Sequence, residues 1–184
     1  RIGWGGLLWR APIRFSGVLS IWLIQSVVIV YLYVATVLLS FFRGIEEVGL
    51  YQAALSFIEV ILVASAILST AFFPVFSRLA KASRGTLISF YEESFRTLLF
   101  FGVPCGVLAL FGAKTLLDLV YGPSFHQALP ALYLLLAGFL LFIFGGLNGY
   151  LLIAMGREKV VLGITLLGAI LNLILNLWAI PRFG

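Results

Sequence analysis

Apolar residues occur in long blocks along this chain, and short polar or charged groups separate the blocks. The apolar runs are continuous and do not alternate with a period of two, so they predict helices that cross a membrane and not strands of a barrel. We expect an all-α polytopic transmembrane helix bundle of about five spanning helices within residues 1–184. The expected spans are residues 15–42, 48–74, 96–119, 129–155 and 160–180.

The second of these blocks carries a carboxylate near its middle. Residues 48–73 suffice to cross a bilayer with some tilt, and Glu59 lies close to the midpoint. Gln52, Ser56 and Thr70 fall on the same helical face as Glu59, because positions 52, 56, 59, 63, 66 and 70 follow one another at steps of four and three residues. A polar stripe of this kind is unfavourable against lipid, so we expect it to face other helices or a hydrated cavity.

Later blocks contain further polar side chains at membrane depth. Asn172 and Asn176 lie on one face of the last block, together with Thr165, and Asn148 lies in a glycine-rich part of the fourth block. Asparagine side chains commonly hydrogen-bond between helices. We therefore keep two interpretations of these residues, as interhelical contacts or as the lining of a cavity.

The longest polar stretch, residues 77–96, follows Pro74 and begins with the basic cluster Arg78, Lys81 and Arg84. We expect a loop here that leads into an amphipathic helix. Basic side chains at such a place anchor a helix at the cytoplasmic surface and contact anionic lipid. Binding of a phosphate headgroup is a second interpretation of the same cluster.

Composition supports a membrane protein and excludes several other classes. Hydrophobic residues make up 62% of the chain and charged residues 10%, whereas soluble domains average about 25% charged residues. The net charge of +5 is better explained by membrane topology than by nucleic-acid binding. One cysteine and one histidine provide neither an internal disulfide nor a metal-ligand cluster. Nothing in the sequence indicates a catalytic constellation or a cofactor site, so we expect a protein that is not an enzyme.

The distribution of basic residues predicts an orientation. Five spans place nine basic residues on one side of the membrane and three, Arg43, Lys114 and Arg182, on the other. The nine are Arg1, Arg10, Arg14, Arg78, Lys81, Arg84, Arg96, Arg157 and Lys159. The positive-inside rule then predicts a multi-pass protein of the cell membrane, with the N-terminal end of this chain in the cytoplasm and the C-terminal end outside.

Several short strings, in this order, carry a resemblance to a known family. They are VGLYQAA at 48–54, FPVFSRL at 73–79, VYGPSF at 120–125, AMGREK at 154–159, and Asn172 and Asn176 followed by IPRFG at 180–184. Together they resemble the polysaccharide-biosynthesis flippases, the O-antigen-type lipid-linked oligosaccharide translocases of the multidrug/oligosaccharidyl-lipid/polysaccharide exporter superfamily. One difference is that many relatives carry an acidic residue late in the first of these helices, where residues 34–39 offer only Thr36.

The resemblance implies a two-lobe transporter of about 12 to 14 helices, of which this chain is similar to the first five helices of the second lobe. It also implies alternating access, in which a lipid-diphosphate-linked glycan crosses the membrane while its tail stays in the bilayer. The expected partners are membrane lipids, this glycan, a coupling ion (H⁺ or Na⁺) and the remaining helices of the transporter. A drug/cation antiporter of the same superfamily, with Glu59 as the coupling site, and a non-transporting membrane scaffold subunit are the alternative interpretations.

Overall fold

A computed structural model describes residues 15–183 of the chain. Five long helices and one short 3₁₀ helix follow one another with brief turns between them. Their bounds are α1 Phe15–Phe42, α2 Ile45–Ala82, α3 Arg84–Val120, η2 Pro123–Ala128, α4 Leu129–Ala154 and α5 Glu158–Phe183. The all-helical architecture predicted from the apolar blocks is confirmed.

Helix length and composition match a membrane environment. In the described part of the chain, four stretches are long and apolar enough to cross a membrane: Gly17–Phe42, Ile45–Ala82, Arg84–Val120 and Glu158–Arg182. Helix α4 adds 26 residues without any charged side chain. At a rise of about 1.5 Å per residue this length corresponds to about 39 Å, which exceeds a hydrocarbon core of about 30 Å.

The prediction of a loop within residues 77–96 is wrong. Helix α2 continues to Ala82 and α3 begins at Arg84, with only Ser83 between them. Pro74 removes one backbone donor but does not end the helix. The ring of Phe90 on α3 packs edge-on against Phe72 and Phe76 of α2, and Phe76 is fully buried. This packing stabilises a helical hairpin that continues past the apolar part of both helices.

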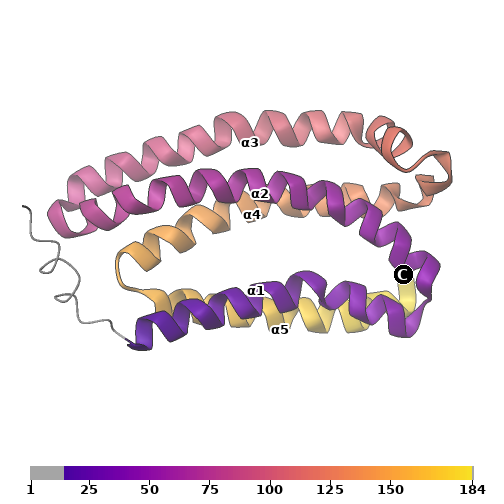
Figure 1. The fold of residues 1–184 in the computed structure, drawn as a ribbon, viewed down its shortest axis with the longest axis horizontal. Helices are drawn as coiled ribbons and strands as arrows, with labels where there is room; N and C mark the ends of the chain where they lie inside the picture. The colour runs from indigo at the N-terminus through magenta and orange to yellow at the C-terminus, as the bar shows by residue number, and fades with distance from the viewer. Residues whose placement is uncertain (1–14, 184) are drawn as a thin grey trace, which may run out of the picture.

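The five helices are arranged in three layers (Figure 1), with α3 outermost, α2 and α4 in the middle, and α1 and α5 on the other side. Helix α1 packs most extensively against α5, and α2 against α4. The main buried cluster of the described residues draws its members from α2, α3, η2 and α4 alone. We call these elements the three-helix group, and α1 with α5 the helix pair.

The chain passes between the helix pair and the three-helix group at two glycines. Gly44 joins α1 to α2 with φ of 150°, and Gly156 joins α4 to α5 with φ of 73°. Side chains with a Cβ rarely adopt these backbone conformations, so glycine is required at both crossings. The two crossings lie at opposite ends of the bundle (Figure 1).

Successive turns lie at alternate ends of the molecule, as five spans require. The α2–α3 junction and the α4–α5 turn share one end, which we call the basic end. It carries Arg78, Lys81, Arg84, Arg157 and Lys159. At the opposite end the α1–α2 turn, the α3–η2 turn and the end of α5 come together. The turns therefore group as the basic-residue count assumed. Arg96, which the count placed in the loop before the third span, lies inside α3 instead, and Arg1, Arg10 and Arg14 lie outside the described residues.

Candidate functional site

The polar stripe of α2 meets a polar face of α1. The Tyr33 hydroxyl donates a hydrogen bond to Oε1 of Glu59 at 3.0 Å, and the Thr36 hydroxyl donates to Oε1 of Gln52 at 3.2 Å. Thr36 and Gln52 are 16 residues apart with Gly44 halfway between them, so the antiparallel hairpin brings them to the same level. The stripe predicted on α2 thus faces a helix whose polar side chains are complementary to it.

These polar pairs are not enclosed by the described residues. The side chains of Tyr33 and Gln52 are exposed, and Glu59 is only half-buried. An ionised carboxylate in the centre of a bilayer costs about 2.5–3.5 kcal/mol on insertion scales unless it meets water or a partner. The Tyr33 hydroxyl is one partner, and the exposed remainder of the face requires water or additional helices.

The third member of the stripe, Ser56, bonds in a different direction. Its Oγ lies 2.9 Å from the Tyr121 hydroxyl at the end of α3 and also donates to the Ala53 carbonyl. The Tyr121 ring packs edge-on against Phe57 and is tilted against Phe125 of η2. Ser56 therefore links α2 to the α3–η2 turn, inside the three-helix group.

Thr70 does not join either set of contacts. Its hydroxyl donates to the carbonyls of Ala66 and Ile67 within α2 itself. Although the sequence places Thr70 on the stripe with Gln52, Ser56 and Glu59, its hydroxyl makes no bond to another helix among the described residues. Thr70 consequently serves as an internal reference for experiments on the stripe.

Between the helix pair and the three-helix group lies a groove with a volume of about 330 Å³. Its wall is mainly apolar and includes Ile58 of α2 and Phe139 of α4. Three residues with polar side-chain groups also line it, Tyr31 of α1, Tyr51 of α2 and Asn172 of α5. A mainly apolar groove with a few polar groups is suited to an amphipathic molecule.

The three asparagines predicted as site residues lie in separate places. Asn172 lines the groove, and its carbonyl and side-chain oxygens accept bonds from Nδ2 of Asn176 at 2.8 and 3.1 Å. Those two bonds lie within α5. Asn148 accepts a bond from the Tyr91 hydroxyl at 2.8 Å and so connects α4 to α3.

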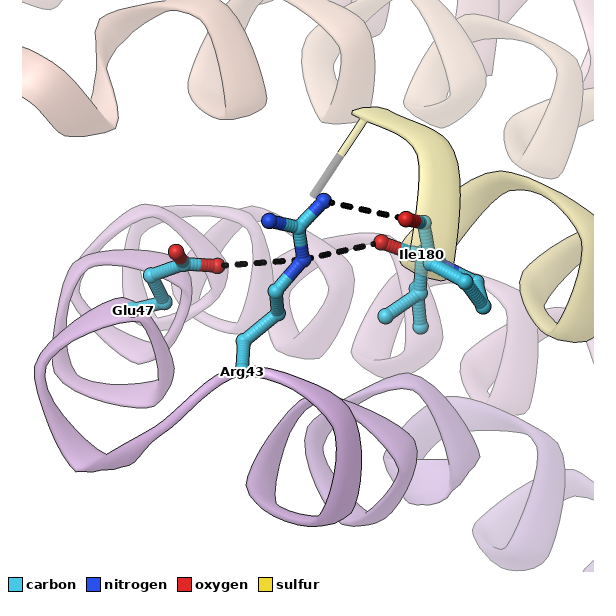
Figure 2. A network of polar contacts seen from close by, with 4 residues as sticks. Arg43, Glu47 and Ile180 are labelled. Atoms are coloured by element: carbon cyan, nitrogen blue, oxygen red, sulfur yellow. Dashed lines mark hydrogen bonds and ion pairs between the residues drawn. The ribbon is translucent and has the colours of Figure 1, made fainter.

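Arg43 connects the α1–α2 turn to the last turn of α5 (Figure 2). Its Nε donates to the Ile180 carbonyl at 3.1 Å and its Nη2 to the Pro181 carbonyl at 3.4 Å, while Glu47 lies 4.0 Å away. The last carbonyls of a helix lack intrahelical donors and carry partial negative charge, which a guanidinium complements. Arg43 thereby fixes α1 to α5 within the helix pair.

Sequence reasoning missed three partners of the stripe as site residues: Tyr33, Thr36 and Tyr121. The signal for the first two was present, because both lie on the polar face of the first block. The basic residues Arg78 and Lys81 are exposed at the end of α2, and Arg84 begins α3. Within residues 15–183, the His, Cys, Asp and Glu side chains form no group of three suited to hold a metal ion.

Long apolar helices packed against one another define an integral membrane protein of the helical-bundle class. Comparison with known families is more specific, since residues 13–130 match the family described as polysaccharide biosynthesis protein. The chain belongs to this family, as its sequence strings suggested.

A relative from Methanocaldococcus jannaschii is described as an uncharacterized membrane protein. It is 25% identical over 154 residues, which cover 83% of this chain. The same alignment covers 30% of the relative, so this chain spans less than a third of the relative's length. No solved structure matches the chain.

Proposed function

We propose that this chain forms part of a transporter that translocates lipid-linked oligosaccharide or polysaccharide repeat units across the cytoplasmic membrane by alternating access. The observation that carries the proposal is the pair of exposed hydrogen bonds, Tyr33–Glu59 and Thr36–Gln52, on the surface of an apolar bundle. Polar groups at this depth are costly unless they serve a hydrated pathway or further helices. Membership of a polysaccharide-biosynthesis family supports a glycan as the cargo.

In this proposal the groove and the polar face of α2 contact different parts of the substrate. The mainly apolar groove beside Asn172 and Tyr31 accommodates an amphipathic part of the substrate. The face with Glu59 and Gln52 lines the hydrated route of the polar part. Glu59 is the group that takes up the coupling ion, because it is the one carboxylate in the apolar stretch of residues 48–73 and lies close to the middle of that stretch.

A scaffold subunit is less well supported. A scaffold would bury its polar stripes tightly between helices, as interhelical contacts do. Here Gln52 is exposed and Glu59 half-buried, so the stripe of α2 remains accessible along one side.

The test is translocation by the natural full-length protein, measured in proteoliposomes with a lipid-linked glycan. Glu59→Gln retains the shape but not the charge, and we expect unchanged protein level with strongly reduced translocation. Thr70→Val is the matched control, because it alters the same stripe at a side chain whose bonds, among the residues that the structure describes, lie within α2. Normal translocation by Glu59→Gln across the pH range would refute the coupling role, and absence of glycan movement by the wild-type protein would refute the function itself.

A further inference from the structure

A second, smaller crevice opens between α3 and α4 at the basic end. It has a volume of about 150 Å³ and is lined by Arg84, Leu87, Ile88 and Tyr91 of α3 with Leu151 and Met155 of α4. Leu87 is buried, and Ile88 and Met155 remain partly exposed along the opening. The crevice is therefore an apolar slot with one cation among its lining residues.

The slot has a defined inner limit. The hydroxyl of Tyr91 donates to Oδ1 of Asn148 at 2.8 Å, so this polar contact bridges α3 and α4. Tyr91 lies two helical turns from Arg84, which corresponds to about 10 Å along α3. The lining therefore runs from the cation of Arg84 to Tyr91 with its bond to Asn148, and the other lining side chains are apolar.

The charge at the mouth has no counter-charge in the described residues. The ion pairs found within residues 15–183 are Arg43 with Glu47 and His126 with Asp118, both at the opposite end of the bundle. Arg84 is exposed, and Arg157 follows Met155 by two residues in the α4–α5 turn. An apolar slot beside unpaired cations is complementary to a molecule with an anionic head and a hydrocarbon chain.

The depth of the slot fits the boundary between bilayer and water. Leu151 and Met155 stand at the end of α4, which carries no charged residue. The facing part of α3 belongs to the helical hairpin that continues beyond the apolar blocks, where the first charges after Arg84 are Glu92 and Glu93. A lipid phosphate at Arg84 would therefore lie beside the end of an uncharged helix, as headgroups border the hydrocarbon core.

We propose that this crevice binds one anionic phospholipid of the surrounding leaflet, with its phosphate at Arg84 and part of an acyl chain between α3 and α4. Basic pockets between transmembrane helices bind anionic headgroups in this way, and each basic residue near the surface contributes about 1 kcal/mol. A free phosphate ion would use the cation and leave the apolar slot without a function. The proposal goes beyond translocation, because it assigns a lipid to a site that is separate from the groove.

The experiment measures lipid binding to the natural full-length protein in detergent by native mass spectrometry, with phosphatidylglycerol and phosphatidylcholine as probes. We expect phosphatidylglycerol to bind preferentially. Arg84→Gln should weaken its binding about fivefold, which is the equivalent of about 1 kcal/mol. Met155→Trp, which fills the slot and retains every charge, should weaken it as well, and so should the milder Leu151→Phe. Lys114→Gln is the control, because it removes one cation from another part of α3.

Three results would overturn the proposal. If phosphatidylcholine bound as tightly as phosphatidylglycerol, the crevice would not recognise the charge of the headgroup. Equal losses from Arg84→Gln and Lys81→Gln, with no effect of Met155→Trp or Leu151→Phe, would show a diffuse basic surface and no slot. Displacement of phosphatidylglycerol by one equivalent of a polyprenyl diphosphate would assign the crevice to the transported lipid. We expect Glu59→Gln to lose translocation but to bind phosphatidylglycerol as the wild type does, because Glu59 does not line the crevice. The proposed function and the lipid site can therefore be refuted independently.

Discussion

Arg43 offers the clearest quantitative test of how the helix pair is held together. Its guanidinium donates two hydrogen bonds to the last turn of α5, at 3.1 and 3.4 Å. Each bond contributes about 0.5–1.5 kcal/mol net, and a cation at a helix C-terminus adds about 0.3–1 kcal/mol. Glu47 at 4.0 Å adds less than about 0.5 kcal/mol, because this pair is partly exposed to solvent.

These magnitudes predict the order of stability of the wild type and three variants. Arg43→Met retains the length of the side chain but loses all donors and the charge, so it should cost about 2 kcal/mol. Arg43→Lys retains the charge and one donor and should cost about half as much. Glu47→Gln should match the wild type within about 0.5 kcal/mol.

The assay is the heat-unfolding midpoint of the natural full-length protein in one fixed detergent. A loss of 2 kcal/mol lowers the midpoint by roughly 4–8 °C in a protein of 150–250 residues and by less in a larger one. The reasoning fails if Arg43→Met unfolds at the wild-type temperature. It also fails if Glu47→Gln is as damaging as Arg43→Met, since the dominant contact would then be the ion pair.

Three further predictions concern the hairpin, the crossings and the orientation. Phe76→Ala should lower thermal stability by about 3–5 kcal/mol because the ring is fully buried, and Phe73→Ala, at a partly exposed ring, should cost clearly less in the same melts. Gly156→Ala should destabilise the protein by 1 kcal/mol or more, because φ of 73° strains any residue with a Cβ; an unchanged melting temperature would contradict this. In a protein whose Cys105 is replaced, single cysteines at Ser83 and Lys159 should react only from the cytoplasm and one at Glu46 only from outside, and labelling of position 83 from outside intact cells would disprove the orientation.

Much of the fold was predictable from the apolar blocks. The first block coincides with α1, and the expected spans ending at residues 119 and 155 end within one residue of α3 and α4. Boundaries of this kind are local, because they depend on where apolar residues stop and on which residue can adopt positive φ.

The hairpin between α2 and α3 was not predictable in the same way. Pro74 and the following charges indicate an ending when they are considered alone. What continues the helix is the packing of Phe72 and Phe76 against Phe90, which requires that α3 already faces α2. Tertiary contacts of this kind override local signals and leave no periodic trace in the sequence.

The candidate site was predictable on one helix and not across helices. The spacing of Gln52, Ser56 and Glu59 identified the stripe on α2, but it did not identify which helix each side chain would contact. Glu59 and Gln52 bond to α1, whereas Ser56 bonds to Tyr121 at the end of α3. Helical periodicity gives a direction around one axis, and the partner depends on how the helices are arranged.

The pairing of α1 with α5 has a consequence for biosynthesis. Arg43 and the Ile180 carbonyl that it contacts are 137 residues apart. At a synthesis rate of about 5–20 residues per second, α1 leaves the ribosome roughly 7–27 s before its main neighbour exists. During that interval α2, α3 and then α4 are completed and can form the three-helix group, while α1 has α2 as its neighbour. The hydrogen bonds from Tyr33 and Thr36 to α2 are thus available to a newly inserted α1 well before α5 arrives, and they give its polar side chains partners while the ribosome completes the chain.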